Sequence, residues 1–431
     1  MPVLRKLAIP CLLVALIACK REEPAPAVSA PAAQPTAAAP IVAPPECNAS
    51  CPGSTCLDAN TIKTAWTPPV DACPSEGGPG QFNVDAFSWN MFVALNWPAN
   101  TTTCTPDQTK SILTSSPSDP VVWQTWSMDS EVFVAKGSSP KPWCVQDALQ
   151  LDDIAKAEPE FAKLGADFLG ISEPGTDVTQ VLGTGVLTDQ NGRWVRYQKL
   201  LNNTEYLYIT EKNLWNVDGQ KGVTVKLPPG SVEIKAAWKV LNDDEKASNR
   251  FYMTSATVYN TPDGETSPGT NPVTLGLVGL HIVASTPNFS RMLWATFEHV
   301  DNDTKWFHSA TSTQTPNTQT AQSPYIELKP DGTPNNEPVQ VTRVAAPGVP
   351  SSPAATDYYR ALLKGSVWEN YELVATQWGQ GINPNGIPGI VANTVIETYI
   401  QPKSSCMGCH TNAKTTAGLS AGMSFLFREA K

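Results

Sequence analysis

Histidine is scarce in this chain. Its 431 residues include four, namely His281, His299, His308 and His410. A structural zinc site needs four ligands close together, yet between Cys144 and Cys406 the only Cys or His residues are the first three of these histidines. The sequence therefore disfavours a multi-ligand zinc site, and any metal chemistry has to use very few imidazoles.

Motifs of several common enzyme classes are also missing. The chain has no nucleophile triad, no phosphate-binding loop and no EF-hand, because Asp-Asn-Asp at residues 301–303 lacks the remaining spacing of a calcium loop. Acidic residues outnumber basic ones by 40 to 30, which gives a formal net charge of −10 and a pI of about 5.0. This charge argues against nucleic-acid binding and against electrostatic docking on anionic lipid.

The N-terminal apolar run is too short to cross a bilayer, which needs about 20 residues. Residues 7–18 follow a basic pair, and residues 16–19 read Leu-Ile-Ala-Cys, which resembles the bacterial lipobox. We therefore expect a signal peptide over residues 1–18, a lipidated Cys19, and an Ala/Pro tether that completes residues 19–45. Lys20 after the lipidated cysteine favours the outer membrane of a bacterial envelope, facing the periplasm or the cell surface.

Six further cysteines fall early in the mature chain. An even number of cysteines in an oxidising compartment predicts up to three disulfides. A metal cluster is the alternative, but no histidine lies among these cysteines. The disulfide candidates are Cys47, Cys51, Cys56, Cys73, Cys104 and Cys144.

A Cys-x-x-Cys-His motif stands near the end of the chain, formed by Cys406, Cys409 and His410. This is the attachment signature of haem c, in which both thiols add to the haem vinyl groups and the histidine is the proximal iron ligand. Zinc sites and thioredoxin-like motifs also contain cysteines three apart. A structural zinc site requires a second ligand pair, however, and a thioredoxin-like motif requires a βαβ unit around it. Because export is predicted independently, we expect one covalent haem c.

Hydrophobic periodicity predicts an α+β fold with an antiparallel β-sheet core, flanking helices and a C-terminal helical haem c segment. Residues 46–150 form a Cys-rich, Trp-rich region with a helix over 86–97. Residues 151–308 are predicted to be mixed helix and then antiparallel sheet, with helical spacing over 192–216. The predicted strands are 232–240, 251–259, 274–284 and 292–300. A long irregular loop is expected over 309–355.

Residues 356–431 form the predicted haem attachment segment. Thr356 is expected to cap a short helix that ends at Gly365. Thr394 and Glu397 have the spacing of a capping box for a second helix. That helix is predicted to end at Pro402, just before the haem motif.

The sixth ligand of the iron is left open by the position of the motif. The only later methionine is Met423, thirteen residues after His410, so we expect an upstream ligand or an open position. His281, within an apolar strand, is the first candidate distal ligand, and His299, beside acidic residues, is the second. Each also has an ordinary structural interpretation: His281 as a core histidine, and His299 as a histidine at the end of a strand.

Two family resemblances rest on these features. The lipobox, the Trp89 to Trp97 segment, the strands of His281 and His299 and the terminal motif together resemble bacterial cytochrome c family lipoproteins. More distantly, a β-rich body before a C-terminal haem motif is similar to cytochrome c′-beta and its hydroxylamine-oxidising relatives. That likeness implies a five-coordinate haem whose distal face binds small molecules. The cross-linking lysine of the hydroxylamine oxidisers has no assignable counterpart here.

Three functions remain open. The first is a membrane-anchored, single-haem cytochrome that transfers electrons to an envelope redox partner, such as a small basic cytochrome. The second is a five-coordinate haem protein that binds or oxidises a gas, a peroxide or a nitrogen compound. The third is an envelope binding module with an auxiliary haem. One iron, few histidines and no clear distal acid–base pair favour electron transfer or ligand binding over a defined enzyme.

Overall fold

The computed structural model describes residues 41–48, 53–72, 80–145, 150–151, 187–258, 272–313, 337–343, 352–379 and 386–431. The predicted signal peptide, Cys19 and most of the tether lie outside these ranges. Cys51 and Cys73 also lie outside them. None of the helices within these ranges is long and apolar enough to span a membrane.

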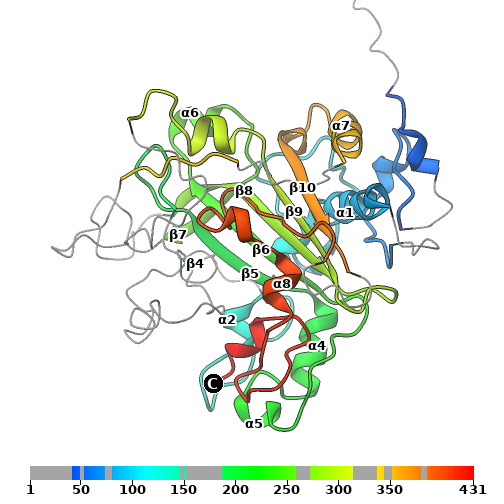
Figure 1. Ribbon diagram of the computed structural model, residues 1–431, viewed down its shortest axis with the longest axis vertical. Coiled ribbons are helices and arrows are strands. Elements are labelled where there is room, and N and C mark those ends of the chain that lie inside the picture. The colour runs from blue at the N-terminus through cyan, green and yellow to red at the C-terminus, as the bar shows by residue number, and fades with distance from the viewer. Residues whose placement is uncertain are drawn as a thin grey trace, which may run out of the picture. The chain divides into compact units, whose positions relative to one another are not determined.

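An eight-stranded sheet forms the centre of the fold, which confirms the predicted α+β class with an antiparallel core (Figure 1). Its strand order is β10-β9-β8-β6-β5-β3; β7 also pairs with β8, and β4 joins β7 as the one parallel pair described. Strands β1 and β2 form a separate two-stranded sheet. The strands are β1 (Ala99–Asn100), β2 (Thr105–Pro106), β3 (Ser127–Met128), β4 (Gln150–Leu151), β5 (Arg196–Leu201), β6 (Val232–Val240), β7 (Met253–Val258), β8 (Val273–Ala284), β9 (Leu293–His299) and β10 (Tyr371–Gln377).

Short helices surround this sheet. The α-helices are α1 (Gln81–Leu95), α2 (Asp129–Val132), α4 (Asn203–Glu211), α5 (Val217–Gln220), α6 (Asp243–Ala247), α7 (Pro353–Leu362) and α8 (Cys406–His410). The 3-10 helices are η1 (Pro45–Asn48), η2 (Thr61–Thr64), η3 (Val122–Thr125), η7 (Val367–Asn370), η8 (Gln401–Lys403) and η9 (Leu426–Arg428), and η6 (Asn302–Trp306) is a π-helix.

One face of the sheet carries an aromatic core. Helix α1 confirms the helix predicted over 86–97, although it begins five residues earlier and ends at Leu95. Trp89 and Phe92 of α1 pack on Phe297 of β9, with ring centroids 5.1 and 4.4 Å apart. Tyr359 of α7 stacks on the other side of Trp89 at 5.4 Å. The tryptophan-rich segment is therefore core, and large aromatic areas of this kind dominate core energetics.

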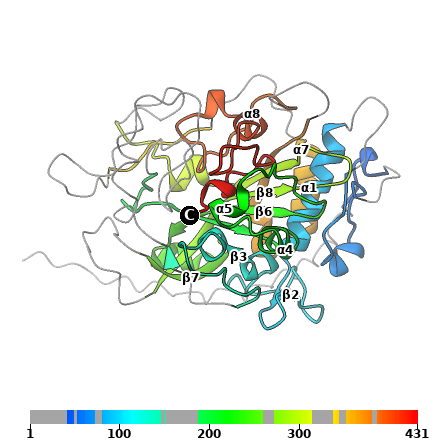
Figure 2. The ribbon, with the colours of Figure 1, turned by 90° about the horizontal axis from the view of Figure 1, so that it is seen from below.

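The opposite face of the sheet is polar and is covered by the C-terminal segment. Thr296 and Glu298, which flank Phe297 in β9, point to this opposite face, because successive side chains of a strand alternate between its two faces. Asn393 donates to the hydroxyl of Thr296 at 3.0 Å, and the backbone N–H of Thr394 donates to Glu298 at 3.0 Å. Figure 2 shows α8 and the red C-terminal segment above β6 and β8 in that view. The Cys-x-x-Cys-His motif therefore packs on this face, where Met407 of the motif shares an apolar cluster with Val283 and Trp294.

The helical spacing predicted over 192–216 is wrong for its first part. Residues 196–201 form strand β5, paired with β6, and only Asn203–Glu211 is helical. Both faces of β5 are covered, so apolar residues appear on both sides of the strand and imitate a helical period. Strands β6, β7, β8 and β9 confirm the four predicted strands, whereas β10 had not been predicted.

The two helices predicted after residue 355 differ in the structure. Helix α7 begins at Pro353 with Ser352 at its N-cap, so Thr356 lies inside the helix; proline is favoured at the first helical position. No helix follows Thr394, because its hydroxyl contacts Glu298 of β9 instead of the backbone ahead. Glu397 accepts from the backbone N–H of Asn393 at 2.8 Å. Thr394 is thus engaged by a tertiary contact and Glu397 by the local backbone, and the predicted capping box does not form.

Two disulfides are present among the described cysteines, which confirms the prediction for these four residues. Cys47 bonds to Cys56, nine residues away, and Cys104 bonds to Cys144, 40 residues away. The candidates Cys51 and Cys73 lie outside the described ranges, as does most of the predicted loop 309–355.

The longer disulfide loop should contribute more to stability. Chain-entropy arguments give about 4 kcal/mol for closing a loop of this length and about 2.5 kcal/mol for the shorter one. We expect the double substitution Cys104→Ala/Cys144→Ala to lower the free energy of unfolding more than Cys47→Ala/Cys56→Ala does. Urea unfolding of both variants measures this. Equal losses would show that native-state contacts, and not loop length, decide the effect.

Candidate functional site

The Cys-x-x-Cys-His motif forms helix α8. Ser405 caps this helix by accepting from the backbone N–H of Gly408 at 3.0 Å. Gln377, the last residue of β10, accepts from the N–H of Met407 at 2.7 Å. Cys406 and Cys409 are both half-buried and neither forms a disulfide. Their spacing of three places both thiols on one side of the helix, as attachment to one planar group requires.

His410 is held by a backbone carbonyl and two aromatic rings. Its Nδ1 donates to the carbonyl of Met423 at 2.8 Å, and this tautomer leaves the lone pair of Nε2 available for a metal. The ring lies 4.2 Å from that of Trp294 and 4.7 Å from that of Phe425. Burial lowers the pKa of His410 to about 4, so the imidazole is neutral, as an iron ligand must be.

His281 lies on the same polar face of the sheet, in the middle of β8. Lys235 of β6 and Thr296 of β9 are its cross-strand partners. Nε2 of His281 lies 3.5 Å from a carboxylate oxygen of Glu397, and it has no hydrogen-bond partner although it is buried. His281 is also close enough to lower the pKa of His410. The structure thus brings the first predicted distal candidate near the predicted proximal histidine.

His299, the second distal candidate, has the contacts of a core histidine. Its Nδ1 accepts from the backbone N–H of Asp301 at 3.2 Å and from the indole of Trp306 at 3.3 Å. Its Nε2 donates to the carbonyl of Arg250 at 3.3 Å, and its ring stacks on Phe251 at 4.6 Å. Both ring nitrogens are therefore engaged, and we do not assign His299 to an iron.

The two thiols differ from those of a thioredoxin-like motif. Burial raises the pKa of Cys406 and of Cys409, whereas a redox-active nucleophilic cysteine needs a lowered pKa. The described parts of the chain hold no group of three or more His, Cys, Asp or Glu side chains that could bind a metal ion. A haem needs less from the protein, namely two thiols and one or two axial ligands, and these are the groups gathered here.

A buried carboxyl pair lies on the same face of the sheet. Glu205 of α4 lies against Glu233 of β6, and the hydroxyl of Ser424 donates to Glu233. Burial, and for Glu205 also the neighbouring charge of Glu233, raises the pKa of both groups. Sequence reasoning missed this pair, because nothing in the pattern marks either glutamate as fully buried.

The proton held by this pair should make stability depend on pH. Because the folded pKa is raised, the contribution of the pair is complete below the unfolded value of about 4.5 and is lost as pH rises through the folded value. We expect Glu205→Gln to remove this loss, so that its advantage over the wild type grows by about 1.4 kcal/mol per pH unit across that window. Urea unfolding between pH 4 and 9 measures it. Parallel curves would contradict it.

The residues of the site fit a covalent haem. An imidazole with its Nδ1 held, two unpaired thiols on one helix, and a second imidazole with an unsatisfied Nε2 are a donor set that suits such a group. No protein-family model, curated protein or solved structure matches this chain. The predicted haem and the family resemblance therefore depend on the chain's own residues.

Proposed function

We propose that this protein is a c-type cytochrome of the bacterial envelope, with one haem bound to Cys406 and Cys409 and with His410 as the proximal ligand. The single observation that carries the proposal is the hydrogen bond from Nδ1 of His410 to the carbonyl of Met423. A core histidine has no need to keep Nε2 free, but a proximal iron ligand does. The unpaired thiols on the same helix support the same assignment.

Electron transfer is the function that this site supports best. We propose His281 as the sixth ligand, because its buried Nε2 lacks a hydrogen bond and it lies on the side of the sheet that carries His410. A haem held by both His410 and His281 would supply one-electron chemistry without a site for a substrate. Trp294 and Phe425 pack against His410, which excludes water from that side of the ring.

A second function is favoured by one contact. Glu397 lies 3.5 Å from His281, and a histidine beside a carboxylate can accept and donate protons at a reacting ligand. If the sixth position is open, this pair would act on a bound gas, peroxide or nitrogen compound. The two functions make opposite predictions about the binding of carbon monoxide.

The location follows from the N-terminal sequence. We propose an outer-membrane lipoprotein anchored through Cys19, with the described body carried on the Ala/Pro tether. The net charge of −10 favours a basic redox partner, because complementary charge steers encounter. Salt should therefore slow electron exchange with such a partner.

Mass spectrometry of the denatured protein tests the covalent haem. The protein is produced by export in a bacterium that attaches haem c, purified, and unfolded in acid before the intact mass is measured. We expect each chain to carry the added mass of one haem. A chain with the mass of the polypeptide and lipid alone would contradict the proposal.

A further inference from the structure

Close contacts connect the buried carboxyl pair with the residue that holds His410. Ser424 donates to Glu233, and Met423, the preceding residue, accepts from His410 at 2.8 Å. The backbone of Met423 has a φ of 77°, a region that residues other than glycine rarely adopt. The surrounding contacts thus fix this short segment between the proximal histidine and the carboxyl pair.

The pair must hold a proton. Both carboxylate oxygens of Glu205 and one of Glu233 are buried without a donor among the described residues, although the two groups contact each other. Two carboxylates in contact in a buried site cannot both remain ionised. One shared proton converts this repulsive contact into a hydrogen bond.

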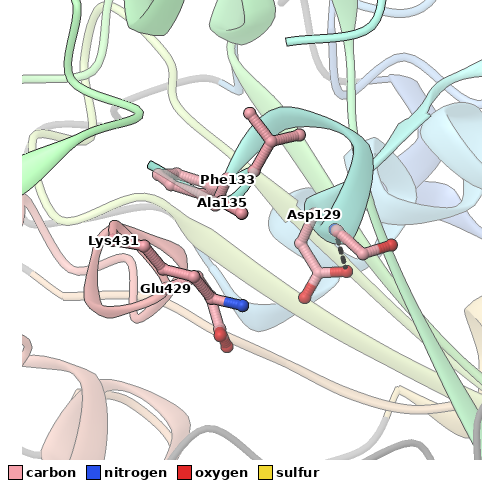
Figure 3. Close-up of a pocket in the computed structure, with 7 residues that line it drawn as sticks. Asp129, Phe133, Ala135, Glu429 and Lys431 are labelled. Atoms are coloured by element: carbon pink, nitrogen blue, oxygen red, sulfur yellow. Dashed lines mark hydrogen bonds between the residues drawn. The ribbon is translucent and has the colours of Figure 1, made fainter. Parts of the chain in front are cut away.

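Charged groups lead from this pair to the surface. Lys199 of β5 forms ion pairs with Asp129 and, at 3.1 Å, with Glu429, and Lys199 and Asp129 both act electrostatically on Glu233. Asp129 and Glu429 line an open pocket of about 220 Å³ together with Phe133, Ala135 and Lys431 (Figure 3). Water in this pocket would meet a carboxylate on each side.

We propose that the pair of Glu205 and Glu233, which shares one proton while the iron is ferric, binds a second proton with each electron that the haem accepts. The proposal rests on the proposed haem at His410. When a redox partner donates one electron to the ferric iron, the carboxyl pair takes one proton from solvent through the pocket at Asp129 and Glu429. When the iron is oxidised again, the electron goes to the acceptor and the proton returns to solvent, so charge and protons balance in both directions.

The sign of the coupling follows from charge. Reduction adds one negative charge near the pair, which strengthens proton binding there. The other charged groups that act on the pair are Lys199 and Asp129. Glu429 is paired with Lys199, and Lys235 lies further along β6. Lys199 is held by two carboxylates, so it does not neutralise the added charge. The reduction potential should therefore fall as pH rises.

Redox titration of the holoprotein between pH 5 and 9 tests the coupling. We expect the reduction equilibrium of the wild type to change by up to tenfold per pH unit, which is about 59 mV for one electron. In Glu205→Gln/Glu233→Gln, which lacks both carboxyl groups, the potential should not depend on pH over the same window. Glu211→Gln, a substitution at the exposed end of the same helix, should keep the slope of the wild type.

Infrared spectroscopy gives a second readout that needs no haem. The purified wild type should show a protonated carboxyl band at pH 7 that Glu205→Gln/Glu233→Gln lacks. A wild type without this band, a flat potential in the wild type, or an unchanged slope in Glu205→Gln/Glu233→Gln would each overturn the inference. These results are distinct from failure of the proposed function, which would show as a protein without covalent haem whose carboxyl band is still measurable.

Discussion

Replacing both Cys406 and Cys409 with alanine should abolish covalent haem in this protein. The two thiols are the only described cysteines outside disulfides, and they lie together on α8. Without them, His410 alone can hold a haem only by coordination, which denaturation breaks. We expect no haem-associated peroxidase staining of the denatured band, against full staining of the wild type.

The matched control is the substitution Cys47→Ala/Cys56→Ala. It also removes two cysteines, but these close a loop of nine residues far from α8 in the chain. This variant should keep covalent haem at the wild-type level. Haem that survives denaturation in the Cys406→Ala/Cys409→Ala protein would end the assignment of the motif.

The second large effect is expected at His281. Substitution by alanine should convert the iron from low-spin to high-spin and should allow carbon monoxide to bind the ferrous protein. The reason is that the other candidate ligand, His299, cannot replace it, since both ring nitrogens of His299 are engaged. The optical spectrum with and without carbon monoxide measures the change.

His308→Ala serves as the control for this variant. His308 is half-buried just after η6, and none of the described contacts joins it to His281 or His410, so its loss should leave the spectrum unchanged. Mutation of Glu397 to glutamine should keep the low-spin spectrum, because the amide still contacts the ring of His281. If His281→Ala also leaves the spectrum unchanged, His281 is not the sixth ligand.

The sheet was largely predictable from the sequence. Strands such as β6 alternate strongly, because one face meets the aromatic core and the other carries charged residues such as Glu233 and Lys235. Strand β5 was misread because it is covered on both faces and loses that alternation. The helix predicted from the capping pair Thr394 and Glu397 does not form for another reason. The hydroxyl of Thr394 donates to Glu298, and the carboxylate of Glu397 accepts from Asn393.

The site was predictable only in part. Cys406, Cys409 and His410 form a contiguous motif whose spacing carries its chemistry. The surroundings of His410 come from distant parts of the chain, such as Trp294 on β9 and Met423 in the tail, and no local pattern brings them together. The same holds for Glu205 and Glu233, which look like surface glutamates in the sequence and lie in contact only after folding.

One measurement tests the central claim most directly, namely the optical spectrum of the purified protein in its ferric and ferrous forms. The account predicts the absorption bands of a c-type haem, a low-spin iron in both oxidation states, and no change when carbon monoxide is added. A protein without haem bands would contradict the assignment of the site. A high-spin spectrum that shifts with carbon monoxide would contradict electron transfer through a six-coordinate iron.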